Sequence, residues 1–178
     1  MTAAVVVRRV AASEWPLVRE LRIEALHDPA AAVAFLGSAA NAGRQPDAFW
    51  QRRTREAAGG PATAQFLAAN LAGDVVGTAT VLRRAAGEVD HLDRVLDADR
   101  ADVVGVYVRP VARGSGAIDA LLDACADWAR QCGDAGLTLD VHVDNARARR
   151  AYERCGFADT GARMTGPIGA ELEMRRTL

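Results

Sequence analysis

The second half of the chain alternates between short apolar runs and stretches with apolar residues at helical spacing. Residues 102–108 form a β-branched run, and residues 137–143 alternate apolar and polar side chains with a period of two. Both patterns predict strands, the first buried and the second with one apolar face. Residues 118–128 and the stretch after Asn145 instead place apolar residues every three or four positions, which predicts a helix after each strand.

Further elements follow from the same patterns and from the positions of Gly, Pro and capping residues. In the first third of the chain we expect a strand at 4–10, a helix capped by Ser13 and ended by Pro29, a short helical turn at 30–35, a loop at 37–46 and a helix at 47–58 capped by Asp47. After these we expect a hairpin of strands at 63–69 and 74–82, a polar loop at 83–101, and, near the end, a loop at 163–169 and a last strand at 171–178. This order predicts an α/β (α+β) fold in which a mixed central sheet is flanked by helices.

Length and composition are those of one globular domain over residues 1–178. Half of the residues are hydrophobic and 25% are charged, an ordinary balance for a chain with a sizeable core. The net charge of −1 argues against wholesale binding of nucleic acid or of an anionic membrane. No stretch has the pattern of a secretory signal or of a membrane span, so we expect a cytoplasmic protein. The three cysteines match neither a disulfide framework nor a zinc pattern, and we expect no metal site.

A basic, glycine-rich turn joins the strand at 102–108 to the helix that follows. It reads Arg113-Gly114-Ser115-Gly116-Ala117, and Pro110, which cannot donate to a sheet ladder, marks the end of the strand. Backbone N–H groups that converge before a helix N-terminus form an anion site, and glycines leave no Cβ in the way of a phosphate. The turn has neither the Lys of a Walker motif nor the Gly spacing of a dinucleotide fingerprint. The alternative is an ordinary connection between a strand and a helix.

A second motif follows the strand at 137–143. It consists of Asn145, an Ala-containing helical stretch with Tyr152, and then Gly156-Phe157. In combination with Val108-x-Pro110 and the glycine-rich turn, this motif resembles the GNAT superfamily of N-acyltransferases. The resemblance extends over almost the whole chain and includes Glu173-Met174 near the last strand.

The resemblance implies the acyl-CoA N-acyltransferase (GNAT) fold, with acetyl-CoA as the co-substrate. The sheet would be splayed between the strands at about 102–108 and 137–143, and Gly105 would permit the bulge that separates them. The pantetheine arm would pair with the first of these strands as an added strand does, and the pyrophosphate would lie on the amides of the turn. The residues implied in cofactor binding are Val106, Tyr107, Val108, Arg113, Gly114, Ser115, Gly116, Ala117 and Asn145.

The resemblance also gives Tyr152 the role of a general acid that protonates the leaving thiolate, the alternative being an apolar core contact. The general base is left open between Asp102, His142 and a chain of waters. For Asp102 a solvated strand end is an equal alternative. Ile118 departs from the family pattern, which usually has Gly or Ala there, and either shifts the phosphate turn or points into the core.

We therefore expect an N-acetyltransferase that moves an acetyl group from acetyl-CoA to a primary amine by direct attack on the thioester. The alternative is a non-catalytic acyl-CoA-binding regulatory module on the same fold, which the presence of Tyr152 disfavours. The acceptor is a small-molecule or peptide amine that the sequence does not identify, and a homodimer stays open. The acidic residues within 83–101 are either a solvated loop or a surface that attracts a cationic amine.

Overall fold

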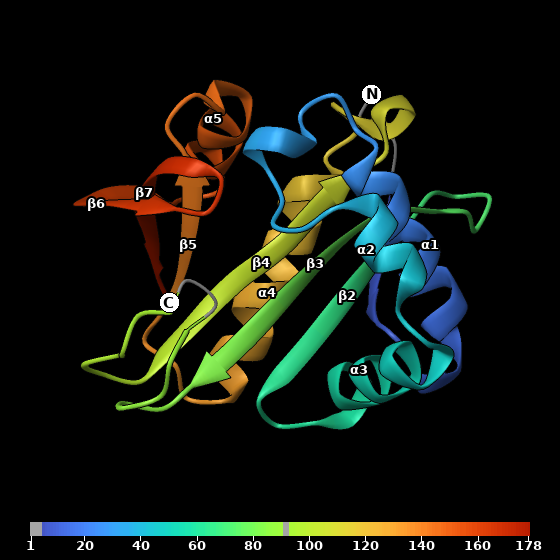
Figure 1. Cartoon of the computed structure of the whole chain (residues 1–178), viewed down its shortest axis with the longest axis horizontal. Coiled ribbons are helices and arrows are strands. Elements are labelled where there is room, and N and C mark those ends of the chain that lie inside the picture. Colours follow the sequence, from blue (N-terminus) through green and yellow to red (C-terminus); the bar gives the residue numbers. More distant parts are fainter. Residues whose placement is uncertain (1–4, 91–92) are drawn as a thin grey trace.

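Seven strands form one sheet in the computed structural model, which describes residues 5–90 and 93–178. Their order across the sheet is β1-β2-β3-β4-β5-β7-β6 (Figure 1). The strands are β1 Val6–Arg9, β2 Thr63–Ala69, β3 Val75–Arg84, β4 Arg100–Val108, β5 Gly136–His142, β6 Ala158–Gly166 and β7 Gly169–Thr177. Within the described residues, β4 and β5 run parallel and the other neighbouring pairs run antiparallel. The predicted mixed sheet is confirmed.

Helices cover both faces of the sheet. In Figure 1, α1 (Trp15–Leu26), α2 (Ala39–Arg44) and α3 (Asp47–Gly59) lie in front of it, and α4 (Ala117–Gln131) lies behind it. A fifth helix, α5 (Ala146–Arg154), stands beyond the end of β5. Three short 3-10 helices, η1, η2 and η3, span Ala12–Glu14, Ala31–Val33 and Pro110–Ala112.

The strand β2 shows how alternating side chains serve the two layers. Phe66 and Ala68 belong to the apolar cluster that packs around α4, whereas Leu67 belongs to the cluster that contains Leu21 of α1 and Trp50 of α3. Leu67 is completely buried, and a Leu side chain in such a place contributes roughly 1.5–3 kcal/mol to stability. The sheet is thus fixed from both sides, which gives a rigid support to any site at its edge.

The strands β4 and β5 separate soon after they meet. Asp102 and Thr138 are register partners, and no other pair between the two strands is recorded among the described residues. On the other side of β4 the register with β3 shifts by one residue around Gly105, whose φ is +61°. That extra residue is a bulge, and a bulge bends its strand. Both the splay and its glycine therefore agree with the sequence prediction.

The strand β6 is the clearest disagreement with the sequence analysis, because the expected loop at 163–169 lies mostly within a hairpin of β6 and β7. Most of β6 is exposed, and it lies at the edge of the sheet. An edge strand with two solvated faces has no apolar alternation to reveal it.

Smaller differences concern helix starts and loops. The expected loop at 37–46 contains α2, whose cap is the Ser38 side chain. Ser13 lies inside η1 and does not cap α1, and Asp47 is the first residue of α3 after the cap position. The polar loop is shorter than expected, since β3 continues to Arg84 and β4 begins at Arg100. Ala4 of the expected first strand lies outside the described residues.

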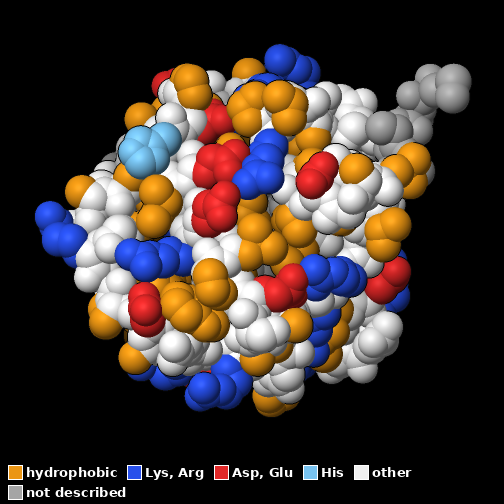
Figure 2. All heavy atoms as spheres, turned by 90° about the vertical axis from the view of Figure 1, so that its right-hand side faces the viewer, with side chains coloured by type: hydrophobic (Ala, Val, Ile, Leu, Met, Phe, Trp, Pro, Cys, Tyr) orange, Lys and Arg blue, Asp and Glu red, His pale blue; other side chains and the backbone are white. Residues whose placement is uncertain are grey.

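The molecular surface agrees with the modest net charge. On the face shown in Figure 2, several Arg side chains lie next to Asp or Glu side chains, and the described residues form no large patch of one sign there. None of the described helices is both long enough and apolar enough to cross a membrane.

Candidate active site

The splay between β4 and β5 opens into a cavity of about 840 Å³. Its walls come from β4 and β5, the turn before α4, one side of α5, and parts of α1 and α3. The cavity therefore connects the glycine-rich turn with the open front face of the sheet. Elements far apart in the sequence, from Arg22 to Glu171, share it.

The glycine-rich turn is built as an anion site. Gly114 and Gly116 have φ values of +78° and +85°, and Gly116 occupies the N-cap position of α4. In the described part of the chain no side chain caps this helix, so the first N–H groups of α4 keep the unsatisfied hydrogen-bonding capacity of a helix N-terminus. The Ser115 hydroxyl donates to the Ala112 carbonyl over 2.7 Å, which stabilises the turn from within.

Arg113 plays a different part from the one its charge suggests. Its Nε donates to the Val108 carbonyl over 3.1 Å, and its Nη2 forms an ion pair with Asp28, which follows α1. The side chain thus joins the end of β4 to the segment after α1. What the turn offers to an anion is its backbone rather than this guanidinium.

The predicted cofactor strand lies along the cavity. Val106 and Val108 are half-buried and line it, and the β5 side of this part of β4 is open because the two strands have separated. The Tyr107 side chain is buried and turns to α1, where its hydroxyl donates to Glu24 over 3.1 Å. Tyr107 can therefore contribute to a ligand site mainly through its backbone.

Asn145 and Tyr152 both line the cavity from α5. The Asn145 side chain accepts from the Ala148 N–H over 3.2 Å, as a helix cap, and its Nδ2 donates to the Val33 carbonyl over 3.3 Å. Tyr152 packs against Phe157 with a ring separation of 6.0 Å. Burial raises the pKa of Tyr152 to about 12, so its phenol holds a proton at neutral pH. The packing contact and a proton-donating role are compatible.

Asp102 lies outside the cavity that the glycine-rich turn, Asn145 and Tyr152 share. Its side chain is fully buried and is not among the residues that line the cavity. Arg100 Nε donates to its carboxylate over 2.5 Å, and Arg84 lies 3.5 Å away on the other oxygen. The strand-end position in the sequence suggested a solvated or catalytic carboxylate, and the structure shows a buried ion pair instead.

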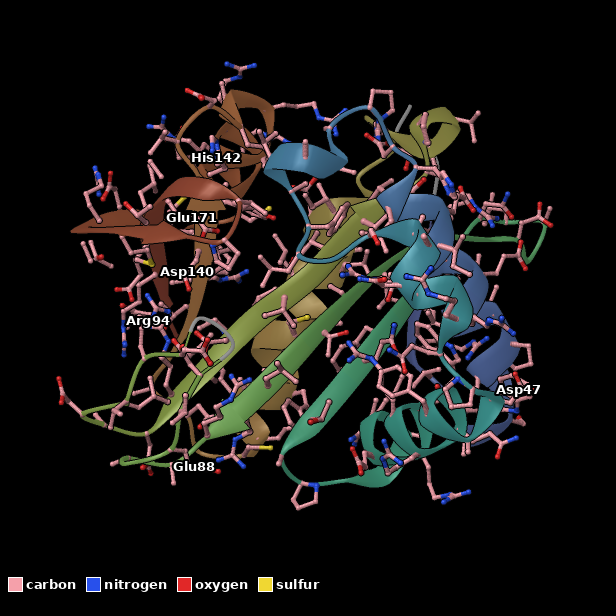
Figure 3. All side chains as sticks on the ribbon, in the orientation of Figure 1. Asp47, Glu88, Arg94, Asp140, His142 and Glu171 are labelled. Carbon is pink, nitrogen blue, oxygen red and sulfur yellow. The ribbon has the colours of Figure 1, made fainter. Side chains whose placement is uncertain are left out.

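An acid wall, formed by Asp140, His142 and Glu171, closes one side of the cavity (Figure 3). His142 and Glu171 are register partners on β5 and β7, so their side chains lie next to each other on one face. The N–H of Asp144 donates to His142 Nδ1 over 3.1 Å, which leaves Nε2 as the protonated nitrogen of the neutral ring. Next to that ring, a Cβ on Gly169 would lie 2.7 Å from Nε2, so only glycine leaves room for it.

Within the described residues, Glu171 differs from its neighbour Asp140 in forming no ion pair. Asp140 forms an ion pair with Arg94 over 2.6 Å. Glu171 is only 5% exposed, and its Oε2 has no hydrogen-bond partner within the described residues. Burial and the nearby charge of Asp140 raise the pKa of Glu171, although His142 and Arg94 oppose this. Glu171 was not predicted as a site residue from the sequence, because a Glu in a strand pattern is usually an ordinary solvent-facing residue.

A basic wall, formed by Arg22, Arg53 and Arg84, lines the cavity on the side of α1, α3 and the end of β3. Arg22 Nη2 donates to the Leu36 carbonyl over 2.5 Å, and its guanidinium lies 5.4 Å from the centre of the Phe35 ring. Arg22 and Arg53 were not predicted as site residues either, because an Arg on a helix usually belongs to its solvated face.

Ile118 both lines the cavity and packs against the main apolar cluster. Its side chain is therefore accommodated beside the turn, while Gly114 and Gly116 keep the left-handed conformation that the turn needs. The departure from the family pattern leaves the conformation of the turn intact.

A family model described as the acetyltransferase (GNAT) family matches residues 24–157. Over 97 residues the chain is 35% identical to an aminoglycoside N(6')-acetyltransferase type 1 of Stenotrophomonas maltophilia, and over 107 residues it is 31% identical to an IAA acetyltransferase of Azospirillum brasilense. These matches cover 54% and 60% of this chain. The chain spans about 61% of the length of each of these relatives, which is less than two thirds.

Solved structures share the whole architecture. A GNAT-family acetyltransferase from Streptococcus pneumoniae superposes with a TM-score of 0.73 at 16% identity, over 98% of this chain and 100% of that one. The yncA protein of Salmonella typhimurium, solved with acetyl-CoA, superposes with a TM-score of 0.66 at 21% identity, over 98% and 94% of the two chains. At these identities the likeness shows the fold.

Proposed function

The chain belongs to the GNAT family of acetyltransferases, and we propose that it is an N-acetyltransferase that transfers an acetyl group from acetyl-CoA to an amine. The observation that carries this proposal is one continuous cavity that joins an uncapped helix N-terminus, an open strand edge, a neutral tyrosine and a buried carboxylate. We take residues 1–178 as a single catalytic domain, since both β1 and β7 belong to the one sheet.

The binding roles follow from what each segment leaves unpaired. The N–H groups of the turn from Arg113 to Ala117, together with the dipole of α4, would hold the pyrophosphate. Backbone groups between Val106 and Val108 would pair with the amides of the pantetheine arm, as a strand edge pairs with a peptide. Asn145 closes the other side of the splay. In this way the cofactor would replace the part of β5 that β4 has lost.

Tyr152 suits the role of general acid in this cavity. The amine nitrogen attacks the thioester carbon, the C–S bond breaks, and the sulfur leaves with the electron pair. A phenol with a pKa of about 12 keeps its proton until that moment and can then donate it to the thiolate. A backbone N–H at the bulge, such as that of Val106, would stabilise the developing charge on the carbonyl oxygen.

We assign the general base to Glu171 in place of Asp102. An amine acceptor is mostly protonated at neutral pH, so a group near it must remove a proton before or during attack. Glu171 lines the cavity, has an unpartnered oxygen and has a raised pKa, all of which make it a better proton acceptor than an ion-paired carboxylate. His142 stands directly beside it and could pass the proton on to water.

The test uses the intact chain with acetyl-CoA and a library of amines. We expect acetyl-CoA to raise the melting temperature, because a ligand at about 100 times its Kd adds about 2.7 kcal/mol to stability. We also expect thiol release that depends on an amine, and an acetylated product by mass spectrometry. Binding without thiol release would favour the non-catalytic regulatory module. Absence of any acetyl-CoA binding at millimolar concentration would overturn the proposal.

A further inference from the structure

The cavity extends beyond the place where the thioester would lie. Leu82 and Arg84 of β3 pair with Asp102 and Arg100, at the end of β4 that is remote from the glycine-rich turn, and both line the cavity. Arg22 and Arg53 line it as well, from α1 and α3. This part of the cavity is therefore available to the acceptor rather than to the phosphates of acetyl-CoA.

Within the described residues, four arginines line the cavity without forming an ion pair: Arg147 and Arg154 on the α5 side, and Arg22 and Arg53 on the side of α1 and α3. Arg84, Arg94, Arg100 and Arg113 each form an ion pair with a carboxylate. Neither Arg22 nor Arg53 forms an ion pair with any carboxylate in the described part of the chain, and Arg22 is held in place only by a carbonyl and an aromatic ring. The Arg22 guanidinium is thus fixed in position, and neither guanidinium is paired with a carboxylate within the described residues.

These two charges also work against each other. Burial lowers the pKa of Arg22, and the proximity of Arg53 lowers it further, whereas Arg53 itself is exposed and has Glu56 nearby. Two like charges beside a cavity are costly unless an anion lies between or in front of them. A guanidinium offers a planar fork of N–H donors that matches a carboxylate, which makes a carboxylate the natural counter-ion.

The acid wall stands on the opposite side of the open face of the sheet (Figure 3). There Asp140 is neutralised by Arg94, so Glu171, whose Oε2 has no hydrogen-bond partner among the described residues, is the carboxyl group that an amine would meet. A molecule with an amine at one end and a carboxylate at the other would satisfy both walls together. A polyamine would instead place a second positive charge next to the two arginines, which would repel it.

We propose that Arg22 and Arg53 bind a carboxylate of the acceptor, so that the substrate is an amine of the amino-acid type. This inference rests on the proposed acetyl transfer and names its substrate class. The amine would lie near Glu171 and Tyr152, and the carboxylate would lie against α1 and α3. The two arginines would then fix the orientation of the acceptor and select against amines that lack an anionic group.

The experiment compares amino acids with their own carboxamides as acceptors. Amino acids with different separations between amine and carboxylate are each paired with the matching amide, and acetylated product is quantified to give kcat/KM. We expect at least one acid to exceed its amide about tenfold to a hundredfold, the usual effect of hydrogen bonds to a charged group. Equal values for every acid and its amide would overturn the proposal.

Variants test the residues themselves. Arg53→Gln is the main variant, since this side chain forms no hydrogen bond or ion pair with any residue of 5–90 or 93–178. Arg22→Gln is the second, with its melting temperature measured. Arg55→Gln is the matched control, because it removes the same charge from α3 outside the cavity lining. We expect the acid-to-amide ratio to fall about tenfold or more in Arg53→Gln and to stay unchanged in Arg55→Gln. The same ratio in both variants would contradict the assignment.

A binding measurement separates this inference from the proposed function. Calorimetry follows the titration of the same amino acids into protein saturated with CoA, where no transfer can occur. Binding that weakens in Arg53→Gln supports the carboxylate site even if no acetylated product forms, a result that would count against the acetyl transfer alone. Transfer to amides and simple amines, with no binding of amino acids, would overturn the carboxylate site and leave the proposed function standing.

Discussion

Replacing Glu171 with Gln should separate catalysis from stability more clearly than any other change in the cavity. The substitution keeps the size and the strand position of the side chain, and removes only its charge and its ability to accept a proton. A general base typically contributes 10² to 10⁴ in rate, so we expect kcat/KM to fall at least about a hundredfold. Acetyl-CoA affinity should be unchanged, because Glu171 lies on the acceptor side.

Stability should change in the opposite direction. Because the folded-state pKa of Glu171 is raised, the folded protein prefers the protonated form, and the stabilisation present at low pH is lost as the pH rises through the folded pKa. Above that pKa the wild-type protein holds a buried charge close to Asp140. We therefore expect Glu171→Gln, which carries no charge, to have a higher free energy of unfolding than the wild-type protein above the folded pKa, and this gain to disappear at low pH.

The assay is steady-state kinetics over a pH series, paired with denaturant unfolding. In the wild-type protein kcat/KM should fall on the acid side with a pKa above that of an ordinary Glu, because the base must be deprotonated to work. Glu171→Gln should lose this acid limb. Glu153→Gln, an exposed change on α5, is the control and should keep it. An unchanged rate in Glu171→Gln, or an acid limb that persists in it, would refute the role of Glu171 as the base.

Three further changes test the rest of the site. Tyr152→Phe keeps the ring and its contact with Phe157, so stability should be retained while kcat falls about a hundredfold; unchanged kcat with chemistry shown to be rate-limiting would leave Tyr152 as packing. Gly116→Val places a β-branched residue at a φ of +85°. Calorimetry should show weaker acetyl-CoA binding, while circular dichroism shows that the protein stays folded. An affinity equal to that of the wild-type protein would remove Gly116 from the site. Asp102→Ala removes one of the two carboxylates that lie 2.5 Å from Arg100 and, since Glu173 still pairs with Arg100, should cost about 3 kcal/mol in chemical denaturation, the low end for a broken buried pair. An intact stability with lost activity would restore Asp102 as a catalytic candidate.

The parts of the site that depend on backbone conformation were predictable from the sequence. Gly105 and Gly116 stand at positions where the chain takes positive φ, and short-range spacing indicated both the bulge and the anion-binding turn. Pro110 and the β-branched run before it located the strand that the cofactor would extend. Such features are local, because they depend on residues that are neighbours in the chain.

The acid and basic walls were not predictable in the same way. Arg22, Arg53 and Glu171 come from α1, α3 and β7, and nothing in their local sequence distinguishes them from solvated charges. What makes them functional candidates is that none of them forms an ion pair with another described residue after folding, which depends on contacts between distant segments. The exposed strand β6 was missed for a related reason, since its place at the sheet edge leaves no apolar period to read.

The fate of the acidic residues in the β3–β4 connection shows how pairing, rather than position, decides which carboxylate can act. From the sequence, this acidic stretch is either a solvated loop or a surface that attracts cationic amines. In the structure Asp90 is 5% exposed and binds Arg94 over 2.6 Å, and Arg94 reaches across to Asp140 on β5. The connection therefore supplies the cation that neutralises Asp140. Because Arg94 is committed to that pair, Glu171 is the carboxylate of the acid wall that remains available to an ammonium group.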